Sequence, residues 1–463
     1  MAFDVGAAQA ATSASRGLRR SHMGAFVAVF ALAFLGSWLL WTNPGYFSHD
    51  ELQWASFAGN SGPIQWVPWL DVASFQYRPL TFNLWLWLSR HLFDTPQLFH
   101  ALLVGWGAAN AGLACVLARR LGVAAWPAAI GALVFALGPY AAYVHGWIGT
   151  IGDLAWVSCA LLVALLVAGG VRAWLLVAGT LLLTTAALLA KEAAVVIPAI
   201  LGVAWLCLAG AAQAATPLRR RVLVATIAAA IVVIAYLALR LPVLLHAPDG
   251  AAAYQVDPAQ VPRHWLEYQL FPFLPPVFEI FNTLARGFGG SLALAGLLWL
   301  GVVAACWRAH ARLALFFLLG GAAALAPVLP MSAASNQYGY GFAALATLAA
   351  AAAWARAPRW ARVALALAAL ACVWHGVNVM RTTRYVGNVQ AVFSPALADA
   401  VRAETEPPLR LRVATDADEW IFRRLTFEIP SYRGVAIDDR VQLVPADAPA
   451  DAVIQRDGRI TPL

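Results

Sequence analysis

Three ionisable residues stand side by side in the stretch "YFSHDELQWASF", residues 46–57, of a chain in which only 12% of the residues are charged. Ser48 and Glu51 fit a capping box, in which a serine caps a helix and the glutamate three residues later folds back. Asp50 would then lie in the first turn, where the helix dipole favours a carboxylate. A carboxylate beside apolar surface also has a raised pKa, which suits a general base. These interpretations are compatible, and we expect Asp50 to be the catalytic base, with Glu51 as its catalytic partner and His49 in support.

The second candidate is Lys191, the only lysine among the 31 lysines and arginines of the chain. It interrupts the apolar stretch "LLLTTAALLAKEAAVVIPAIL", residues 181–201, together with Glu192. One interpretation is a helical hairpin whose tip carries a snorkelling lysine. Arginine would serve there equally well, so a retained ammonium indicates a need for a compact charge, such as one that holds a phosphate. The composition, rich in alanine and arginine, is typical of a GC-rich bacterial genome.

Arg78 in "YRPL" and Arg240 in "LALRLPVLLH" are further cations beside apolar segments. Each alone is typical of a helix end, but together with Lys191 they would form a cluster for an anionic head group. Asp153 in "GWIGTIGDLAW" is expected to be the N-cap of a helix that faces the same compartment as Asp50. A divalent cation at Asp50 and Asp153 is a further alternative, because hard cations favour carboxylates.

The elements that must position these residues are membrane helices. The chain of 463 residues is 62% hydrophobic, with a mean hydropathy of +0.70, and its apolar runs are long enough to cross about 30 Å of hydrocarbon. We predict an all-α polytopic membrane protein with about eleven spans. The five cysteines fall in apolar runs without metal-ligand spacing. The spans are expected near residues 24–41, 97–117, 124–143, 153–170, 173–190, 193–210, 222–240, 291–307, 312–329, 338–355 and 361–377.

Charge is distributed unequally between the two sides of these spans. Arginines fill the loops of one side, which the positive-inside rule places in the cytoplasm together with the N-terminus. The ten acids between residues 5 and 380 all fall on the other side, so we expect the chemistry to be extracytoplasmic. The net charge of +8 is explained by this topology, and no nucleic-acid partner is expected. These acids are Asp50, Glu51, Asp71, Asp94, Asp153, Glu192, Asp249, Asp257, Glu267 and Glu279.

Three regions follow from this pattern: a cytoplasmic tail (1–23), a transmembrane domain (24–380) and a small periplasmic region (381–463). Outer loops 42–96 and 241–290 are expected to contain amphipathic helices, the second broken by prolines. About half of the 23 acids lie after residue 380. The stretches "LRLRVAT", "WIFRRLTF" and "DAVIQRDGRI" there predict strands and hence a C-terminal α/β tail.

The order of the motifs "HDE", "YRPLTFNLWLW", "PYAAYVHGWIGTIGDL" and "LLAKEAAVVIPAIL" resembles the GT-C superfamily of polytopic membrane glycosyltransferases, especially the branch of the protein O-mannosyltransferases and the TPR-bearing transmembrane mannosyltransferases. The resemblance implies that Asp50 is the base, that Asp153 is the second-loop acid, and that Arg78, Lys191 and Arg240 bind a polyprenyl phosphate. The family's arginine two positions before the second acid is Ile151 here, and the TPR array is absent.

These observations together predict an inverting, mannosyltransferase-like enzyme of the bacterial inner membrane. It would move a sugar from a polyprenyl-phosphate donor to an extracytoplasmic acceptor, which the sequence leaves open as protein, lipid or glycan. Its partners would be that donor, membrane lipids and the acceptor, with no cofactor other than the alternative divalent cation. A transporter or flippase of lipid-linked sugars is the main alternative, and a scaffold that binds a partner through its tail is another.

Overall fold

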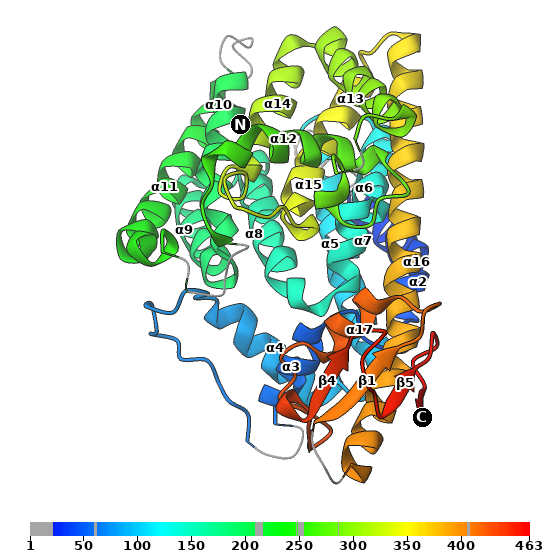
Figure 1. Cartoon of the computed structure of the whole chain (residues 1–463). Helices are drawn as coiled ribbons and strands as arrows, with labels where there is room; N and C mark the ends of the chain where they lie inside the picture. Colours follow the sequence, from blue (N-terminus) through cyan, green and yellow to red (C-terminus); the bar gives the residue numbers. More distant parts are fainter. Residues whose placement is uncertain are drawn as a thin grey trace, which may run out of the picture.

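The structure is a computed structural model that describes residues 22–59, 63–208, 216–246, 248, 254–285, 287–404 and 408–463. Residues 1–21, most of the predicted N-terminal tail, and Asp249 lie outside the described residues. Long helices pack side by side in one bundle (Figure 1). The C-terminal strands gather at one end of this bundle, beside α3 (His49–Phe57) and α4 (Pro79–Leu92). We call this end the sheet end.

Six helices of the described residues are long and apolar enough to cross a membrane. A seventh span results if α6 (Ala125–Leu137) and α7 (Pro139–Gly146), which are bent by 53°, are counted together. Pro139 stands at the bend, where its missing N–H cannot continue the helix. A mostly helical, multi-pass architecture is therefore confirmed. The six are α5 (Pro96–Arg120), α8 (Ile151–Ala168) with the preceding η1 (Ile148–Thr150), α9 (Ala173–Ala190), α11 (Thr216–Leu244), α13 (Gly290–Ala309) and α16 (Arg359–Ala403).

The structure does not show the eleven spans predicted from the sequence. The remaining predicted segments are helical but short, and a 15-residue helix rises only about 23 Å, less than the ~30 Å of hydrocarbon. Hydropathy counts apolar residues but does not detect where a helix breaks, for example at Ser37. The short segments are the helix His22–Gly36 with α2 (Trp38–Trp41), η2 (Glu192–Val196) with α10 (Ile197–Cys207), α14 (Ala311–Leu325), and α15 (Gly339–Trp354).

The two long connections predicted on the outer side contain short helices, as expected. In the first, Pro79 occupies the opening turn of α4, where a missing N–H costs nothing. In the second, prolines separate η5 (Pro258–Gln260), α12 (Val261–Leu270), η6 (Phe271–Phe273) and η7 (Ile280–Asn282). The Trp265 ring of α12 meets Trp299 of α13 edge to face, with centroids 5.7 Å apart. The second connection is therefore packed onto the bundle.

Helix α16 links the bundle to the C-terminal region. Its 45 residues span about 68 Å, more than twice the hydrocarbon thickness, so it must project well beyond a membrane. Figure 1 shows it running along one side of the molecule to the strands. Four of these form a mixed sheet in the order β4-β1-β5-β6, with β1 (Leu409–Val413) parallel to β4 (Val441–Val444) and β5 (Ala452–Ile454), and β6 (Ile460–Pro462) antiparallel to β5.

Two of the three predicted C-terminal strand segments are confirmed, and one is wrong. "LRLRVAT" contains β1 and "DAVIQRDGRI" contains β5 and the start of β6, whereas "WIFRRLTF" lies in the helix α17 (Glu419–Thr426). Its buried residues Ile421, Phe422 and Leu425 follow a helical spacing that outweighs their strand propensity. The short strands β2 (Ser431–Tyr432) and β3 (Val435–Ala436) and the turn η9 (Asp438–Arg440) follow. The Phe422 ring packs on Phe393 of α16 at 5.1 Å, which fixes α17 to the bundle.

Candidate functional site

Glu51 fixes the start of α3 to the rest of the bundle. One of its carboxylate oxygens accepts hydrogen bonds from the N–H groups of Phe47 (2.6 Å) and Ser48 (2.8 Å), and the other accepts from that of Ile148 (2.9 Å). The predicted capping box is thus confirmed. Burial raises the pKa of Glu51 to about 7, although the three N–H groups oppose this shift. Glu51 is fully occupied, so it positions the α3 start rather than facing a ligand.

Asp50, the next residue back, stands on this fixed turn and reaches solvent. Its side chain is 28% exposed, and its carboxylate lies 2.9 Å from Nε2 of His49. The His49 ring meets Phe427, just after α17, edge to face. Asp50 also acts electrostatically on Arg424 of α17, whose pKa is raised: burial lowers it, but Tyr143, Glu279 and Asp50 outweigh burial. The sequence-predicted base therefore lies near residues of the C-terminal region.

A polar cavity of about 600 Å³ opens beside these groups. Arg424 and Glu279 face each other in its lining at 3.5 Å, and the Tyr143 hydroxyl influences the pKa of both. Burial raises the pKa of Glu279, and Arg424 opposes this shift. The cavity draws on five separate parts of the chain, which only the fold brings together. Its lining consists of Tyr143, Trp147, Phe278, Glu279, Phe281, Asn282, Ser335, Gln337, Thr382, Trp420 and Arg424.

Arg424 connects the C-terminal region to the Asp50 turn. Its guanidinium lies 4.2 Å from the Phe47 ring centroid and 5.6 Å from that of Trp147, and its Nε donates to Ser48 Oγ at 3.3 Å. Cation–π contacts of a desolvated arginine contribute roughly 2 kcal/mol. The arrangement holds α17 against the element that carries Asp50.

Two of the predicted phosphate-binding cations lie in a second cluster. Lys191 forms a buried ion pair with Asp153, and its ammonium lies 4.9 Å from the Tyr338 ring centroid. Arg78 donates from Nε to Glu192 at 2.7 Å. Burial lowers the pKa of Arg78, but Glu192 outweighs it and holds the pKa above its usual value. The cluster combines two cations with two acids and has no formal net charge.

The packing of α8 against the end of α9 creates the Lys191 pair. A Cβ added at Gly152 would lie 2.8 Å from the Ala190 carbonyl oxygen, so only glycine allows this approach. Asp153 is the third residue of α8, and the N-cap is Thr150 rather than Asp153 as expected. The Lys191 side chain is 6% exposed. Its ammonium is therefore paired with the Asp153 carboxylate.

Arg240, near the end of α11, lies beside this cluster and, among the described residues, makes no ion pair with it. It is buried and donates to the backbone carbonyls of Val72 and Phe75, the second at 2.8 Å, with its guanidinium over the Tyr77 ring. These contacts hold the segment that leads into Arg78. Arg240 therefore helps to position residues 72–77, the segment that precedes Arg78.

The polar cavity and the second cluster are separated by one short segment. Ser335 and Gln337 of the connection between α14 and α15 line the cavity, and the next residue, Tyr338, lies under Lys191. Among the described residues, no hydrogen bond or ion pair joins Asp50 to Lys191 or Arg78. No group of three or more His, Cys, Asp or Glu side chains within the described ranges is arranged to hold a metal ion.

Sequence reasoning missed Arg424, Trp420 and Gln337, and it did not single out Glu279 among the outer acids. One signal was available, because Trp420 and Arg424 are four residues apart and share a face of a helix. A strand over 420–427 would also place both residues on one face. Nothing in the sequence indicated that this face contacts the helical bundle. Gln337 and Glu279 had no local signal.

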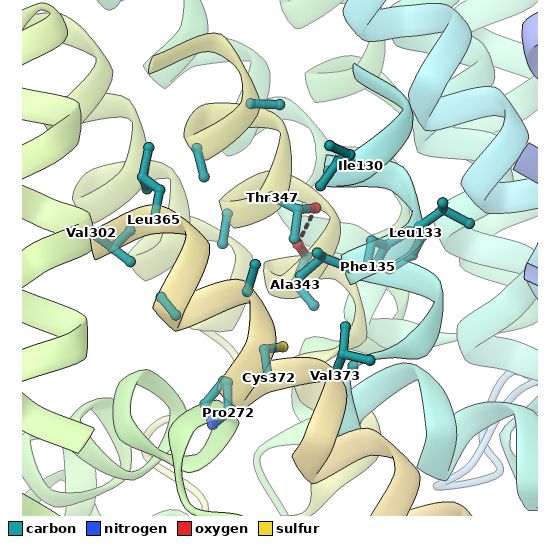
Figure 2. Close-up of a pocket in the computed structure, with 18 of the residues that line it drawn as sticks. Ile130, Leu133, Phe135, Pro272, Val302, Ala343, Thr347, Leu365, Cys372 and Val373 are labelled. Carbon is teal, nitrogen blue, oxygen red and sulfur yellow. Dashed lines mark hydrogen bonds between the residues drawn. The ribbon is translucent and has the colours of Figure 1, made fainter. Parts of the chain in front are cut away.

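A second cavity, lined mostly by apolar side chains, offers no comparable chemistry. It has a volume of about 630 Å³ and lies between α6, α13, α15 and α16. Figure 2 shows that its walls are formed by apolar side chains such as Ile130, Leu365 and Val373. The hydroxyl of Thr347 is used by a bond to the Ala343 carbonyl of 2.8 Å, drawn there as a dashed line. We therefore place the candidate site at the polar cavity.

Comparisons with known proteins concern the overall fold. No protein-family model and no curated protein sequence matches the chain. The chain is similar to the crystal structure of ArnT from Cupriavidus metallidurans bound to undecaprenyl phosphate, with a TM-score of 0.47 and 15% identity over 91% of this chain and 86% of that one. It is also similar to the archaeal oligosaccharyltransferase AglB from Archaeoglobus fulgidus in complex with an inhibitory peptide and a dolichol-phosphate, with a TM-score of 0.43 and 13% identity over 86% of this chain and 63% of that one.

The chain thus resembles these two structures in overall fold, and it spans less than two thirds of AglB. Its expected place in the protein O-mannosyltransferase branch is not supported by these matches. At TM-scores below 0.5, they carry no argument about the chemistry of this chain.

Proposed function

We propose that this protein is an inverting glycosyltransferase of the bacterial inner membrane that takes its sugar from a polyprenyl-phosphate donor on the periplasmic side. The observation that carries the proposal is the Asp50 carboxylate, partly exposed on a turn that Glu51 fixes. It acts electrostatically on Arg424 and Tyr143, which line the polar cavity. A positioned carboxylate that reaches solvent next to a cavity is what a general base requires.

In the proposed reaction, Asp50 accepts the proton of an acceptor hydroxyl as its oxygen attacks the anomeric carbon of the donor sugar. The bond between that carbon and the phosphate oxygen breaks, and the electron pair leaves with the polyprenyl phosphate. Attack from the opposite face inverts the configuration. Negative charge grows on the departing phosphate, so a nearby cation stabilises the transition state.

Arg78 is the proposed phosphate ligand, because its side chain retains 14% exposure and its bond to Glu192 uses only Nε. The planar guanidinium offers further donors that match phosphate oxygens. Lys191 and Arg240 are assigned to the same donor site as supports, since one is held by Asp153 and the other by two carbonyl groups. This revises the direct contacts expected of these two residues.

The test is transfer in vesicles that contain the purified full chain and a radiolabelled polyprenyl-phosphate sugar. Asp50→Asn keeps the size of the side chain but removes the base, and we expect transfer to fall about 10²- to 10⁴-fold. Asp71→Asn is the matched control, because Asp71 is an exposed acid of the same connection outside the cavity lining. A folded Asp50→Asn protein with the wild-type rate would contradict the proposal. Movement of labelled lipid across the bilayer without bond cleavage would instead indicate the transporter alternative.

A further inference from the structure

The lining of the polar cavity combines aromatic faces with planar hydrogen-bonding groups. Trp420 and Phe281 remain 41% and 47% exposed, and Tyr143, Trp147 and Phe278 complete an apolar wall around the Glu279 and Arg424 pair. Exposed aromatic rings in a polar recess are costly unless something packs on them. The wall therefore fits a ligand with both apolar faces and polar edges.

Two groups of the lining have no hydrogen-bond partner among the described residues. One is the indole N–H of Trp147, which is a donor, and the other is Oε1 of Gln337, which is an acceptor. A buried polar atom without a partner costs roughly 1–3 kcal/mol. Both atoms are enclosed, so a ligand would reach them only if the Trp147 and Gln337 side chains turn toward the cavity, and it would then have to donate and accept. A hydroxyl group does both.

We infer that this cavity is a saccharide-binding subsite, and that the acceptor of the proposed transfer is a glycan rather than a peptide or a simple lipid. A sugar ring presents C–H faces that pack on Trp420 and Trp147 and a rim of hydroxyl groups that reach Gln337 and Glu279. A hydroxyl of the bound saccharide near the rim would face Asp50. The identification of the saccharide as the acceptor rests on the proposed function. The binding of a saccharide in this cavity does not.

The C-terminal region contributes one wall of this subsite. Trp420 and Arg424 are the residues of α17 that line the cavity, one helical turn apart. The neighbouring pair Glu419 and Arg423 makes its own ion pair on the exposed face. The choice of saccharide therefore depends on the C-terminal region as well as on the bundle.

The experiment is saturation-transfer NMR on the purified full chain in detergent, without donor, so that binding is measured apart from transfer. The probes are a panel of neutral and uronic-acid disaccharides and, as a counter-probe, a serine-containing hexapeptide. We expect at least one disaccharide to bind, and Trp420→Ala and Gln337→Ala each to weaken it at least 10-fold. Trp66→Ala is the control, since Trp66 is an exposed tryptophan outside the cavity lining.

Each outcome decides the inference. Loss of disaccharide binding in both variants with wild-type binding in Trp66→Ala supports it. No disaccharide binding, binding of the peptide alone, or disaccharide binding that is unchanged in Trp420→Ala would overturn it. Disaccharide binding without any transfer in vesicles would overturn the proposed function and leave the subsite standing. Transfer to the peptide at a rate that Trp420→Ala does not change would overturn the saccharide subsite and leave the proposed function standing.

Discussion

Two adjacent carboxylates have different roles because their surroundings differ. Glu51 is enclosed and accepts three backbone N–H groups, while Asp50 projects beside it and reaches solvent. Residue type alone does not separate them. Burial converts one carboxylate into a fixed anchor and leaves the other available for proton transfer.

The anchor role of Glu51 makes a prediction about stability and pH. The pKa of Glu51 is raised from 4.5 to about 7 in the folded chain, so the folded state binds more protons than the unfolded state between these values. The stabilisation is complete below about pH 4.5 and is lost as the pH rises to about 7, by about 3 kcal/mol at most. Thermal unfolding in detergent at a series of pH values should show this fall in wild type.

Glu51→Gln should lack this fall and should be less stable than wild type at pH 4.5 by roughly 1–3 kcal/mol, because an amide NH₂ would face a backbone N–H. The difference should shrink toward pH 7, as wild type loses its own stabilisation. Glu428→Gln serves as the control, since Glu428 is an exposed glutamate of the C-terminal region. A pH profile of Glu51→Gln that parallels wild type would show that Glu51 does not carry the effect.

At the scale of elements, α17 is the connection between the C-terminal region and the site. Its two adjacent arginines provide a matched pair. The Arg423 side chain is 72% exposed and pairs with Glu419 on its own helix, whereas that of Arg424 is 21% exposed and contacts Glu279, Ser48 and two aromatic rings. Position on the helix, and not residue type, separates their roles.

We predict that Arg424→Ala destabilises the protein by roughly 1–3 kcal/mol, because it leaves Glu279 half-buried without its cation. The pKa of Glu279 should rise further once the charge that opposes burial is gone. Arg423→Ala should change stability by less than about 0.5 kcal/mol, as is usual for exposed pairs. Melting temperatures in detergent and transfer rates in vesicles measure both. Equal effects of the two substitutions would show that Arg424, and with it α17, has no particular role at the site.

At the scale of the whole molecule, the sheet lies toward one end of the bundle, and α16 connects this end to the other (Figure 1). Helix α17, which lies beside the sheet, contributes Trp420 and Arg424 to the lining of the polar cavity. The arginine-rich loops predict that the opposite end is cytoplasmic. Placing the cavity in the periplasm is thus a statement about orientation. In the proposed orientation, the donor of the proposed transfer is lipid-borne rather than a soluble nucleotide sugar.

Cysteine labelling tests this orientation. Asp457→Cys places an exposed thiol in the C-terminal region, and Arg308→Cys places one at the far end of α13. A maleimide reagent that does not cross the inner membrane should label the first in intact spheroplasts and the second only after permeabilisation. The five native cysteines, which are buried or half-buried, give the background in wild type. The reverse pattern would place the cavity in the cytoplasm.

The sequence by itself determined the class of architecture and the local start of the site. A run of apolar residues is a property of the chain, so the helical, multi-pass character and the capping box at Ser48 followed without knowledge of contacts. It predicted eleven spans where the described residues show six or seven candidates, because hydropathy does not detect helix breaks such as the one at Ser37. It also placed α17 wrongly, because the burial of Ile421 and Phe422 depends on α16.

Only the tertiary structure decided which charges are free and which residues share a cavity. The pairing of Lys191 with Asp153 depends on the approach of α8 to α9 at Gly152, and the occupation of Arg240 depends on two carbonyl groups far away in the chain. Arg424, Glu279 and Gln337 come from segments that no periodicity relates. Charge and hydrogen bonding act through space, so the availability of a side chain is fixed only when the distant partners that satisfy it are in place.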